Sequence, residues 1–310
     1  MTMRHILNIS DLSVAELREV LALAQTPVSQ LGMPYAGHAL ALIFEKPSNR
    51  TRQSMEVATV QLGGHPIYTR GEEVGIDTRE TAEDVARVMA GYHAVIAARV
   101  FKHDVVQRMA LVSRVPVLNM LSDYSHPLQG LADVLTMEQQ IGDLRGKKIA
   151  WVGDYNNVAR SLAEACVMLG ATVSIATPVG YGPSEAELKR INVLGEGEVT
   201  ATVRTSESVE GAVCVHTDVW VSMGQEAQTS AKEAIFQEYK VTSHMMSLAA
   251  PEALFFHCLP AHRGYEVDAD VIDGSTSRVV EQAHNRLHSA RGLLAFIAKV
   301  QPPTVKEGVV

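Results

Sequence analysis

The amino-acid sequence predicts an α/β protein of two domains, each a mainly parallel sheet flanked by helices. The chain has 310 residues, and single hydrophobic cores usually stop growing below that length, so two domains are expected. Short apolar runs alternate with amphipathic stretches along most of the chain, which is typical of parallel sheets covered by helices. A composition of 46% hydrophobic and 20% charged residues fits a globular protein.

The first half of the chain contains the elements of the first predicted sheet. A capping box at Ser13 and Glu16 begins a helix, because each side chain can bond the other residue's unpaired N–H. A second helix follows the first strand and ends near Gly63, and a third lies around residues 105–112. The predicted strands are the apolar runs 39–44, 94–98 and 115–119.

The second half repeats the alternation after a break. The amphipathic stretch 131–141 ends at Gly142, and we place the domain boundary there. The last amphipathic stretch, 279–300, is long enough to cross back over the first domain. We therefore predict a first domain over 1–142, with 279–300 packed on it, and a second over 143–278. The predicted strands of the second domain are 148–152, 171–175, 212–216 and 253–257.

Composition excludes several classes of function. The net charge of −8 argues against a nucleic-acid surface. No window is apolar enough for a signal peptide or a membrane span. Cys166, Cys214 and Cys258 are widely spaced and odd in number, so they form no disulfide framework, and a cytoplasmic protein is expected. A dinucleotide oxidoreductase is disfavoured because Gly-x-Gly-x-x-Gly is absent. With no metal cluster either, we expect no cofactor.

One candidate anion site follows the first strand. Ser48 and Thr51 supply hydroxyl groups where a helix begins, and a helix N-terminus carries unpaired N–H groups and partial positive charge. Arg50 and Arg52 add charge, but residues two apart on a helix face different ways, so we expect one at the ligand and one holding the loop. The simpler alternative is a helix cap with two surface arginines.

Other strand ends carry further polar groups. Arg99 follows one predicted strand, and His126 and Gln129 follow the next, at the edge where open α/β sheets bind ligands. These segments resemble the Ser-x-Arg-Thr-Arg and His-Pro-x-Gln motifs of the aspartate/ornithine carbamoyltransferase family, with Asn49 in place of the usual Thr. The resemblance implies transfer of a carbamoyl group from carbamoyl phosphate to an amine. Arg99, His126 and Cys258 would be the catalytic residues. The implied carbamoyl phosphate ligands are Ser48, Asn49, Arg50, Thr51, Arg99, His126, Gln129, Cys258, Leu259 and Arg286.

The second half resembles the ornithine-type members of this family in three segments, 153–158, 217–225 and 257–264. The resemblance implies that Asn157 holds the substrate α-carboxylate, and that Asp218 pairs with its α-ammonium group, assisted by Ser222 and Met223. The acceptor would then be the δ-amine of L-ornithine and the products L-citrulline and phosphate, in arginine metabolism. Met223 as a core residue and Cys258 as an inert thiol are the alternatives for those two positions.

The resemblance also implies a homotrimer with sites at subunit interfaces. Glu73, in loop 70–80, stands where ornithine-type enzymes usually carry a Gln that reaches a neighbouring subunit's site, so that role is not transferred to it. Tyr265 and His284 also depart from the family pattern. Two other functions stay open: transfer to another amine, such as putrescine or an N-acylornithine, and a non-catalytic member that binds carbamoyl phosphate.

Overall fold

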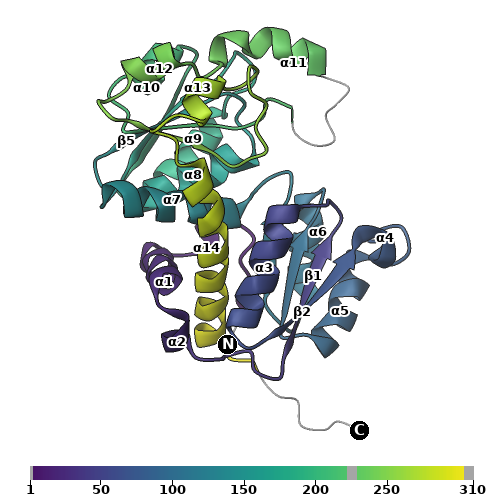
Figure 1. The fold of residues 1–310 in the computed structure, drawn as a ribbon. Helices are drawn as coiled ribbons and strands as arrows, with labels where there is room; N and C mark the ends of the chain where they lie inside the picture. The colour runs from purple at the N-terminus through teal and green to yellow at the C-terminus, as the bar shows by residue number, and fades with distance from the viewer. Residues whose placement is uncertain (1–2, 222–228, 304–310) are drawn as a thin grey trace, which may run out of the picture. The chain divides into compact units, whose positions relative to one another are not determined.

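The computed structural model describes residues 3–221 and 229–303. Contacts within the chain divide it into two compact units, shown as ribbons in Figure 1. Unit 1 comprises Met1–Ala132 and Arg286–Val310, and unit 2 comprises Asp133–Asn285. Two helices, α7 (Pro127–Ile141) and α14 (Val279–Val300), contribute residues to both units. The sequence places the boundary at Gly142, after α7, whereas the contacts divide the chain within that helix.

Unit 1 is built on a parallel sheet with strand order β2-β1-β3-β4. Its strands are β1 (Ala39–Phe44), β2 (His65–Arg70), β3 (Val95–Arg99) and β4 (Val117–Leu121). The central strands β1 and β3 are apolar and almost fully buried, whereas β2 lies at an edge and is half exposed. The other helices of the unit are η1 (Ile9–Asp11), α1 (Val14–Gln25), α2 (Val28–Leu31), α3 (Asn49–Gln61), α4 (Gly71–Val74), α5 (Ala82–Tyr92) and α6 (His103–Val112).

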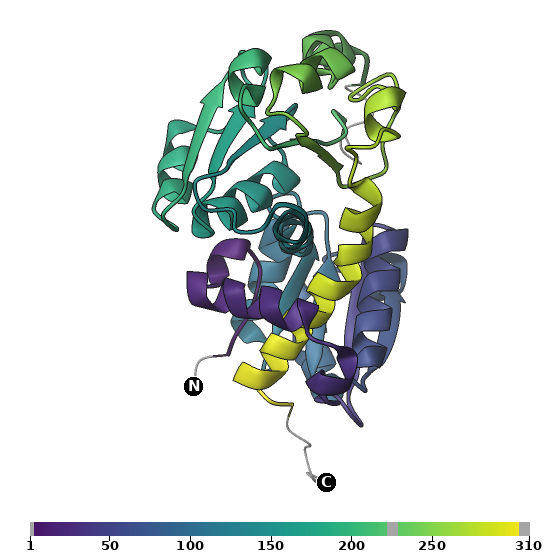
Figure 2. The ribbon, with the colours of Figure 1, turned by 60° about the vertical axis from the view of Figure 1, so that its left-hand side comes forward.

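The C-terminal part of α14 is held in unit 1 by close contact with the N-terminal helices. Figure 2 shows the yellow helix α14 beside the purple helix α1. The Arg291 guanidinium donates to the Ala24 carbonyl oxygen at 2.9 Å, and the buried Tyr35 hydroxyl donates to the Leu294 carbonyl oxygen at 2.9 Å. A Cβ atom at Gly292 would lie 2.5 Å from the carbonyl oxygen of Val20, so this approach requires glycine.

Unit 2 is built on a second parallel sheet, with strand order β7-β6-β5-β8-β9. Its strands are β5 (Lys148–Val152), β6 (Thr172–Ala176), β7 (Glu198–Thr202), β8 (Cys214–Thr217) and β9 (Leu254–His257). The strand order reverses at β5, and ligands of open α/β sheets bind beyond the carboxyl ends of strands at such a reversal. The helices are α8 (Asn157–Met168), α9 (Glu185–Asn192), α10 (Thr205–Val209), α11 (Thr229–Phe236), η3 (Gln237–Tyr239), α12 (Ser243–Leu248) and α13 (Ala269–Ile272).

The predicted fold class is confirmed, because both sheets are parallel and flanked by helices. The seven predicted strands are present, with ends shifted by two residues at most. The apolar-run pattern does not predict β2 and β7, because both are edge strands with polar, partly exposed residues. No helix in the described part of the chain is both long and apolar enough to cross a membrane.

Candidate active site

The predicted phosphate loop lies between β1 and α3, as expected for an anion site in a parallel sheet. Ser48 is the N-cap of α3, and its Oγ atom accepts from the backbone N–H of Thr51 at 3.4 Å. The Ser48 hydroxyl also donates to the Thr51 Oγ1 atom at 3.1 Å. Thr51 is buried, and Asn49 is exposed on the first turn. The first N–H groups of a helix have no partner within the helix, so an anion bound at this N-terminus can accept from them.

The two arginines of this helix turn differ in their surroundings. The Arg52 Nε atom donates to Glu56 Oε1 at 2.8 Å, and its guanidinium lies 3.8 Å from the ring centroid of Tyr68 on β2. Arg52 therefore ties α3 to the neighbouring strand. Arg50, half-buried on the same turn, is the arginine that we expect at the ligand.

Arg99 and His126 lie at the ends of the adjacent strands of unit 1. Arg99 is the last residue of β3 and is 4% exposed. His126 directly precedes α7 and is 5% exposed. Burial lowers the pKa of His126 well below its ordinary value, and the nearby Arg286 and Arg99 lower it further. The imidazole is consequently neutral at physiological pH and can donate one N–H without carrying charge.

Arg286 connects three segments of unit 1 that are distant in the sequence. From α14, it donates to Gln129 Oε1 at 2.7 Å and to Thr51 Oγ1 at 3.1 Å. Its side chain is 4% exposed, so its charge is held in a largely water-free environment. Unit 1 thus brings the predicted carbamoyl phosphate residues Thr51, Gln129 and Arg286 into direct contact, beside Arg99 and His126. The buried guanidinium groups of Arg99 and Arg286, together with the hydroxyl of Thr51 at the start of α3, are suited to a small dianion.

In unit 2, three strand-end loops meet at the carboxylate of Asp218. Asp218 follows β8 and is 8% exposed. Its Oδ1 atom accepts from the Cys258 thiol at 3.0 Å, and its Oδ2 atom accepts from the Asn156 side-chain amide at 2.7 Å. Cys258 follows β9, and Asn156 follows β5. The carboxylate is therefore oriented by residues of two neighbouring loops.

Asn156 is a residue whose role the sequence analysis missed. It is the N-cap of α8, and its Oδ1 atom accepts from the N–H groups of Val158 and Ala159 at 2.9 and 3.1 Å. An Asn directly before an apolar helical pattern is the signal that could have identified it. Asn157, which the sequence predicts as a substrate ligand, is the first residue of α8. The predicted substrate residues Ser222 and Met223 lie outside the described residues.

A buried ion pair that the sequence analysis also missed lies in the loop after β5. Lys232 on α11 is 4% exposed, and its Nζ atom lies 2.7 Å from Asp154 Oδ2 and 3.1 Å from the Trp220 carbonyl oxygen. Burial raises the pKa of Asp154, while Lys232 opposes that shift. The contact connects α11 to the loops that follow β5 and β8.

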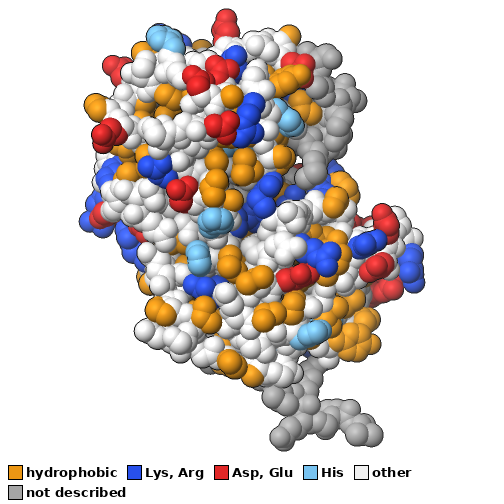
Figure 3. Space-filling model, viewed as in Figure 1, with side chains coloured by type: hydrophobic (Ala, Val, Ile, Leu, Met, Phe, Trp, Pro, Cys, Tyr) orange, Lys and Arg blue, Asp and Glu red, His pale blue; other side chains and the backbone are white. Residues whose placement is uncertain are grey.

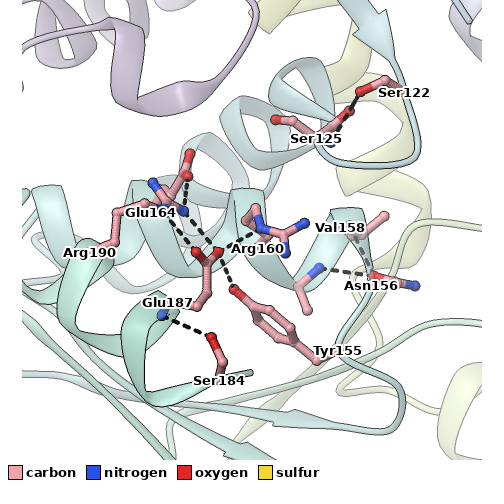
Figure 4. A network of polar contacts seen from close by, with 11 residues as sticks. Ser122, Ser125, Tyr155, Asn156, Val158, Arg160, Glu164, Ser184, Glu187 and Arg190 are labelled. Carbon is pink, nitrogen blue, oxygen red and sulfur yellow. Dashed lines mark hydrogen bonds and ion pairs between the residues drawn. The ribbon is translucent and has the colours of Figure 1, made fainter. Parts of the chain in front are cut away.

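The same loop is anchored to α9 by the polar network in Figure 4. The Glu187 carboxylate accepts from the Tyr155 hydroxyl at 3.1 Å, from Arg160 at 2.6 Å and from Arg190 at 2.8 Å. Arg190 also donates to the buried Glu164 at 2.6 Å. Burial alone would raise the pKa of Glu187, but the two arginines bring it down to about 2. Glu187 thus stays ionised and holds the residue that precedes Asn156.

One cluster in the described residues has the donor atoms of a metal site. Asp218, His257 and Cys258 each place one ligand atom within 4.8 Å of the others. Both nitrogens of His257 already have partners, because Nδ1 accepts from Leu259 N–H at 2.9 Å and Nε2 lies 3.1 Å from Glu266 Oε1. Hydrogen bonds within the protein account for this cluster, and we assign no metal to it.

The 70–80 loop folds back on its own unit. Glu73 Oε2 accepts from the Arg70 N–H at 3.3 Å across the short helix α4. Asp77 and Glu83 both pair with Arg108 of α6. These contacts account for the ordered loop without a ligand role for Glu73.

Comparison with known proteins places both units in one family. Residues 4–139 match the family model "Aspartate/ornithine carbamoyltransferase, carbamoyl-P binding domain" and residues 145–297 match "Aspartate/ornithine carbamoyltransferase, Asp/Orn binding domain". An ornithine carbamoyltransferase of Thermus thermophilus is 44% identical over 298 residues, covering 96% of this chain and 97% of that protein. A Pyrococcus furiosus protein named "Ornithine carbamoyltransferase, anabolic" is 42% identical over 302 residues, covering 95% and 96%.

Comparison with solved structures finds the same family as comparison with sequences. A solved ornithine carbamoyltransferase structure from Pyrococcus furiosus matches with a TM-score of 0.89 and 40% identity, covering 94% of this chain and 96% of that one. Both family models together cover most of the chain, and the predicted resemblance is thereby confirmed. The chain belongs to the aspartate/ornithine carbamoyltransferase family.

Proposed function

We propose that this protein transfers the carbamoyl group of carbamoyl phosphate to the δ-amine of L-ornithine, giving L-citrulline and phosphate. The observation that carries the proposal is the Asp218 carboxylate held between Cys258 and Asn156, in a chain whose relatives are named ornithine carbamoyltransferases. A buried carboxylate beside a thiol suits a substrate with a free α-ammonium group. One of these relatives is named anabolic, which favours the direction of citrulline synthesis, in arginine biosynthesis.

The proposed roles in unit 1 follow from the charge that develops in the reaction. The amine nitrogen attacks the carbonyl carbon, the bond from that carbon to the phosphate oxygen breaks, and the amine proton leaves with the phosphate. Ser48, Asn49, Arg50 and Thr51 would hold the phosphate at the start of α3. Arg99 would bridge the phosphate and the carbonyl oxygen, on which negative charge grows. The neutral His126 would donate to that oxygen, and removing one such donor typically slows a reaction about 100- to 1,000-fold.

The remaining carbamoyl contacts come from three groups. Gln129 would accept from the carbamoyl NH2 group, as would the Leu259 carbonyl oxygen. Arg286 would contact the same group, and its bond to Gln129 Oε1 at 2.7 Å supports a shared task for the two side chains. Cys258 would position the δ-amine and contact the carbamoyl group. It needs no covalent intermediate, because phosphate is already a good leaving group.

In unit 2, Asn157 would bind the α-carboxylate of ornithine and Asp218 its α-ammonium group, with Ser222 and Met223 completing the contacts. We propose residues 1–142, with 279–300, as the carbamoyl phosphate-binding domain, and 143–278 as the ornithine-binding domain. The descriptions of the two family models support this assignment. No step in this chemistry requires a cofactor or a metal.

We place the reaction in the cytoplasm and in a homotrimer. The free thiols of Cys166, Cys214 and Cys258 are compatible with a reducing compartment. The trimer is supported by exposed apolar side chains at one edge of unit 1, where Val60 of α3 is 62% exposed and Ile67 of β2 is 41% exposed. On the face shown in Figure 3, basic side chains are interspersed with acidic ones, which does not favour a nucleic-acid partner.

A colorimetric assay for ureido products tests the proposal. Carbamoyl phosphate is supplied with ornithine, aspartate, putrescine or N-acetylornithine in parallel, and we expect turnover with ornithine alone. Putrescine lacks the carboxylate for Asn157, and N-acetylornithine lacks the charged ammonium group for Asp218. Preference for another amine would overturn the assignments in unit 2. Absence of turnover with all four would leave a non-catalytic carbamoyl phosphate-binding protein.

A further inference from the structure

The turn after β9 is strained at a residue that the reaction uses. Leu259, whose carbonyl oxygen we assign to the carbamoyl group, has a φ of 58°. A branched side chain rarely adopts this left-handed conformation, which persists only where surrounding contacts hold it. The contacts that hold this turn are therefore part of how the site is built.

The side chain of His257 is one of these contacts. It is 1% exposed, and its Nδ1 atom accepts from the Leu259 N–H at 2.9 Å. Because Nδ1 faces a donor, it carries no proton, so the ring proton is on Nε2. Nε2 lies 3.1 Å from Glu266 Oε1 and donates to it. The imidazole is thus held in one tautomer between the turn and a carboxylate.

Glu266 is buried, and its Oε1 atom accepts two hydrogen bonds. It is 1% exposed, and its Oε1 atom also accepts from the His262 N–H at 2.6 Å. Burial would raise the pKa of Glu266, but the hydrogen bonds from His257 and His262 bring it below its ordinary value. An ionised carboxylate has no proton to donate. It can only accept from Nε2, and this leaves Nδ1 available for Leu259.

A second buried chain of hydrogen bonds holds the backbone of the same turn. Gln282 of α14 is 1% exposed, and its Oε1 atom accepts from the His257 N–H at 3.0 Å. Its Nε2 atom donates to Oδ1 of the fully buried Asp133 at 2.6 Å. The turn is therefore held by Gln282 at the His257 N–H, by Glu266 at the His257 ring, and by that ring at the Leu259 N–H.

We infer that Glu266 is a positioning residue for carbamoyl transfer: through the His257 tautomer it keeps the Cys258 thiol and the Leu259 carbonyl oriented toward the acceptor amine. This inference rests on the proposed function and deepens it. Glu266 acts through His257 and does not itself touch a substrate. The position of Cys258 is visible in its 3.0 Å bond to Asp218, which requires the turn to keep its present shape.

The test compares Glu266→Ala with Glu266→Gln. The glutamine keeps an oxygen that can accept from His257 Nε2, whereas alanine leaves Nε2 without an acceptor. For Glu266→Ala we expect kcat/KM for ornithine to fall roughly 10- to 100-fold, the range for the loss of a residue that orients a ligand and for a misplacement of about 1 Å. For Glu266→Gln we expect activity within about threefold of the parent, since one neutral hydrogen bond changes little. The KM for carbamoyl phosphate should change less than kcat/KM for ornithine in both, because most of its proposed ligands belong to unit 1 and only Leu259 and Cys258 belong to this turn.

A matched control removes a buried hydrogen bond elsewhere in unit 2. Ser208 is fully buried, and its hydroxyl donates to the Ser174 carbonyl oxygen at 2.6 Å, away from the β9 turn. Ser208→Ala should lower the unfolding temperature while leaving kcat/KM for ornithine unchanged. If Glu266→Ala fails to fold, Glu266→Asp replaces it, since the shorter side chain keeps the charge but retracts from His257.

A second readout is independent of turnover. The rate at which iodoacetamide alkylates Cys258, followed by peptide mass spectrometry, reports the position of the thiol in the turn. The other two cysteines should react little, because burial raises the pKa of Cys214 to about 12 and also raises the pKa of Cys166. We expect a changed Cys258 rate in Glu266→Ala and the parent rate in Glu266→Gln. If the parent itself does not turn over ornithine, the proposed function fails and the alkylation rates still decide the positioning role. Equal activity and equal alkylation in Glu266→Ala and Ser208→Ala would overturn it, as would equal losses in the alanine and glutamine variants.

Discussion

Asn156 combines two tasks that substitution can separate. Its Oδ1 atom caps α8 through Val158 and Ala159, and its Nδ2 atom donates to Asp218. Asn156→Ser keeps a hydroxyl that can cap the helix, but the shorter side chain cannot also reach Asp218. Asn156→Ala removes both contacts. The difference in unfolding free energy between the two variants gives the contribution of the helix cap. The loss of activity that both variants share gives the contribution of the hydrogen bond that orients Asp218.

The structure sets the size of both effects. Serine and asparagine are comparable caps, whereas alanine at an N-cap costs about 1 kcal/mol of stability. A hydrogen bond to a charged group contributes roughly 1.5–3 kcal/mol. Asp218 is 8% exposed, so little water replaces the lost donor. If that whole energy is expressed in the transition state, kcat/KM for ornithine falls about 10- to 150-fold in both variants.

Two measurements on each variant test the orienting role and the capping role of Asn156. Initial rates at saturating carbamoyl phosphate give kcat/KM for ornithine. Urea unfolding followed by tryptophan fluorescence gives stability, and it reports unit 2 alone because both tryptophans, Trp151 and Trp220, belong to that unit. Parent-like kcat/KM in Asn156→Ser would refute the orienting role. Equal unfolding midpoints for the serine and alanine variants would refute the capping role.

Three further predictions concern the proposed reaction and its assembly. The reaction rate should rise from pH 6 to about pH 9, because a lysine-like amine with a pKa of roughly 10.4 is neutral in only about one molecule per thousand at pH 7.4. His126, whose pKa burial lowers, stays neutral throughout and adds no opposing change, so a flat profile would contradict this account. Arg286→Lys keeps the charge, but one ammonium group cannot bond both Gln129 and Thr51. The KM for carbamoyl phosphate should therefore rise about tenfold or more in steady-state assays. An unchanged KM would show that Arg286 does not contact carbamoyl phosphate. Val60→Asp, at an exposed apolar position, should shift the mass by light scattering from trimer toward monomer, and an unshifted trimer would place the interface elsewhere.

The sequence predicts the buried parts of the fold well and the exposed parts poorly. The interior strands of each sheet are continuous apolar runs, such as 39–44 and 148–152, which one pattern suffices to identify. The missed strands β2 (His65–Arg70) and β7 (Glu198–Thr202) lie at the sheet edges and lack a continuous apolar run. Their short polar segments resemble loops until a neighbouring strand supplies the hydrogen bonds.

The candidate site divides in a similar way. Residues that would touch substrate, such as Arg99 and His126, could be named from motifs at strand ends. The residues that hold the β9 turn could not be named in this way, because Glu266 and Gln282 act on it through hydrogen bonds to His257 and belong to none of the motifs. Sequence spacing carries no information on such bonds. The roles assigned to the motif residues stay predictions until the variants are measured.

The discontinuity of unit 1 has a consequence for synthesis on the ribosome. Tyr35 and its acceptor Leu294 are 259 positions apart, yet both belong to unit 1. At translation rates of about 5–20 residues per second, the part of α14 that contacts the N-terminal helices is made on the order of 10 to 50 s after them. Unit 2, an uninterrupted stretch of chain, can complete its contacts earlier. During this interval the side of α1 that Gly292 later approaches at Val20 and Ala24 is open to chaperones and to other nascent chains, so the synthesis of α14 governs when α1 is protected.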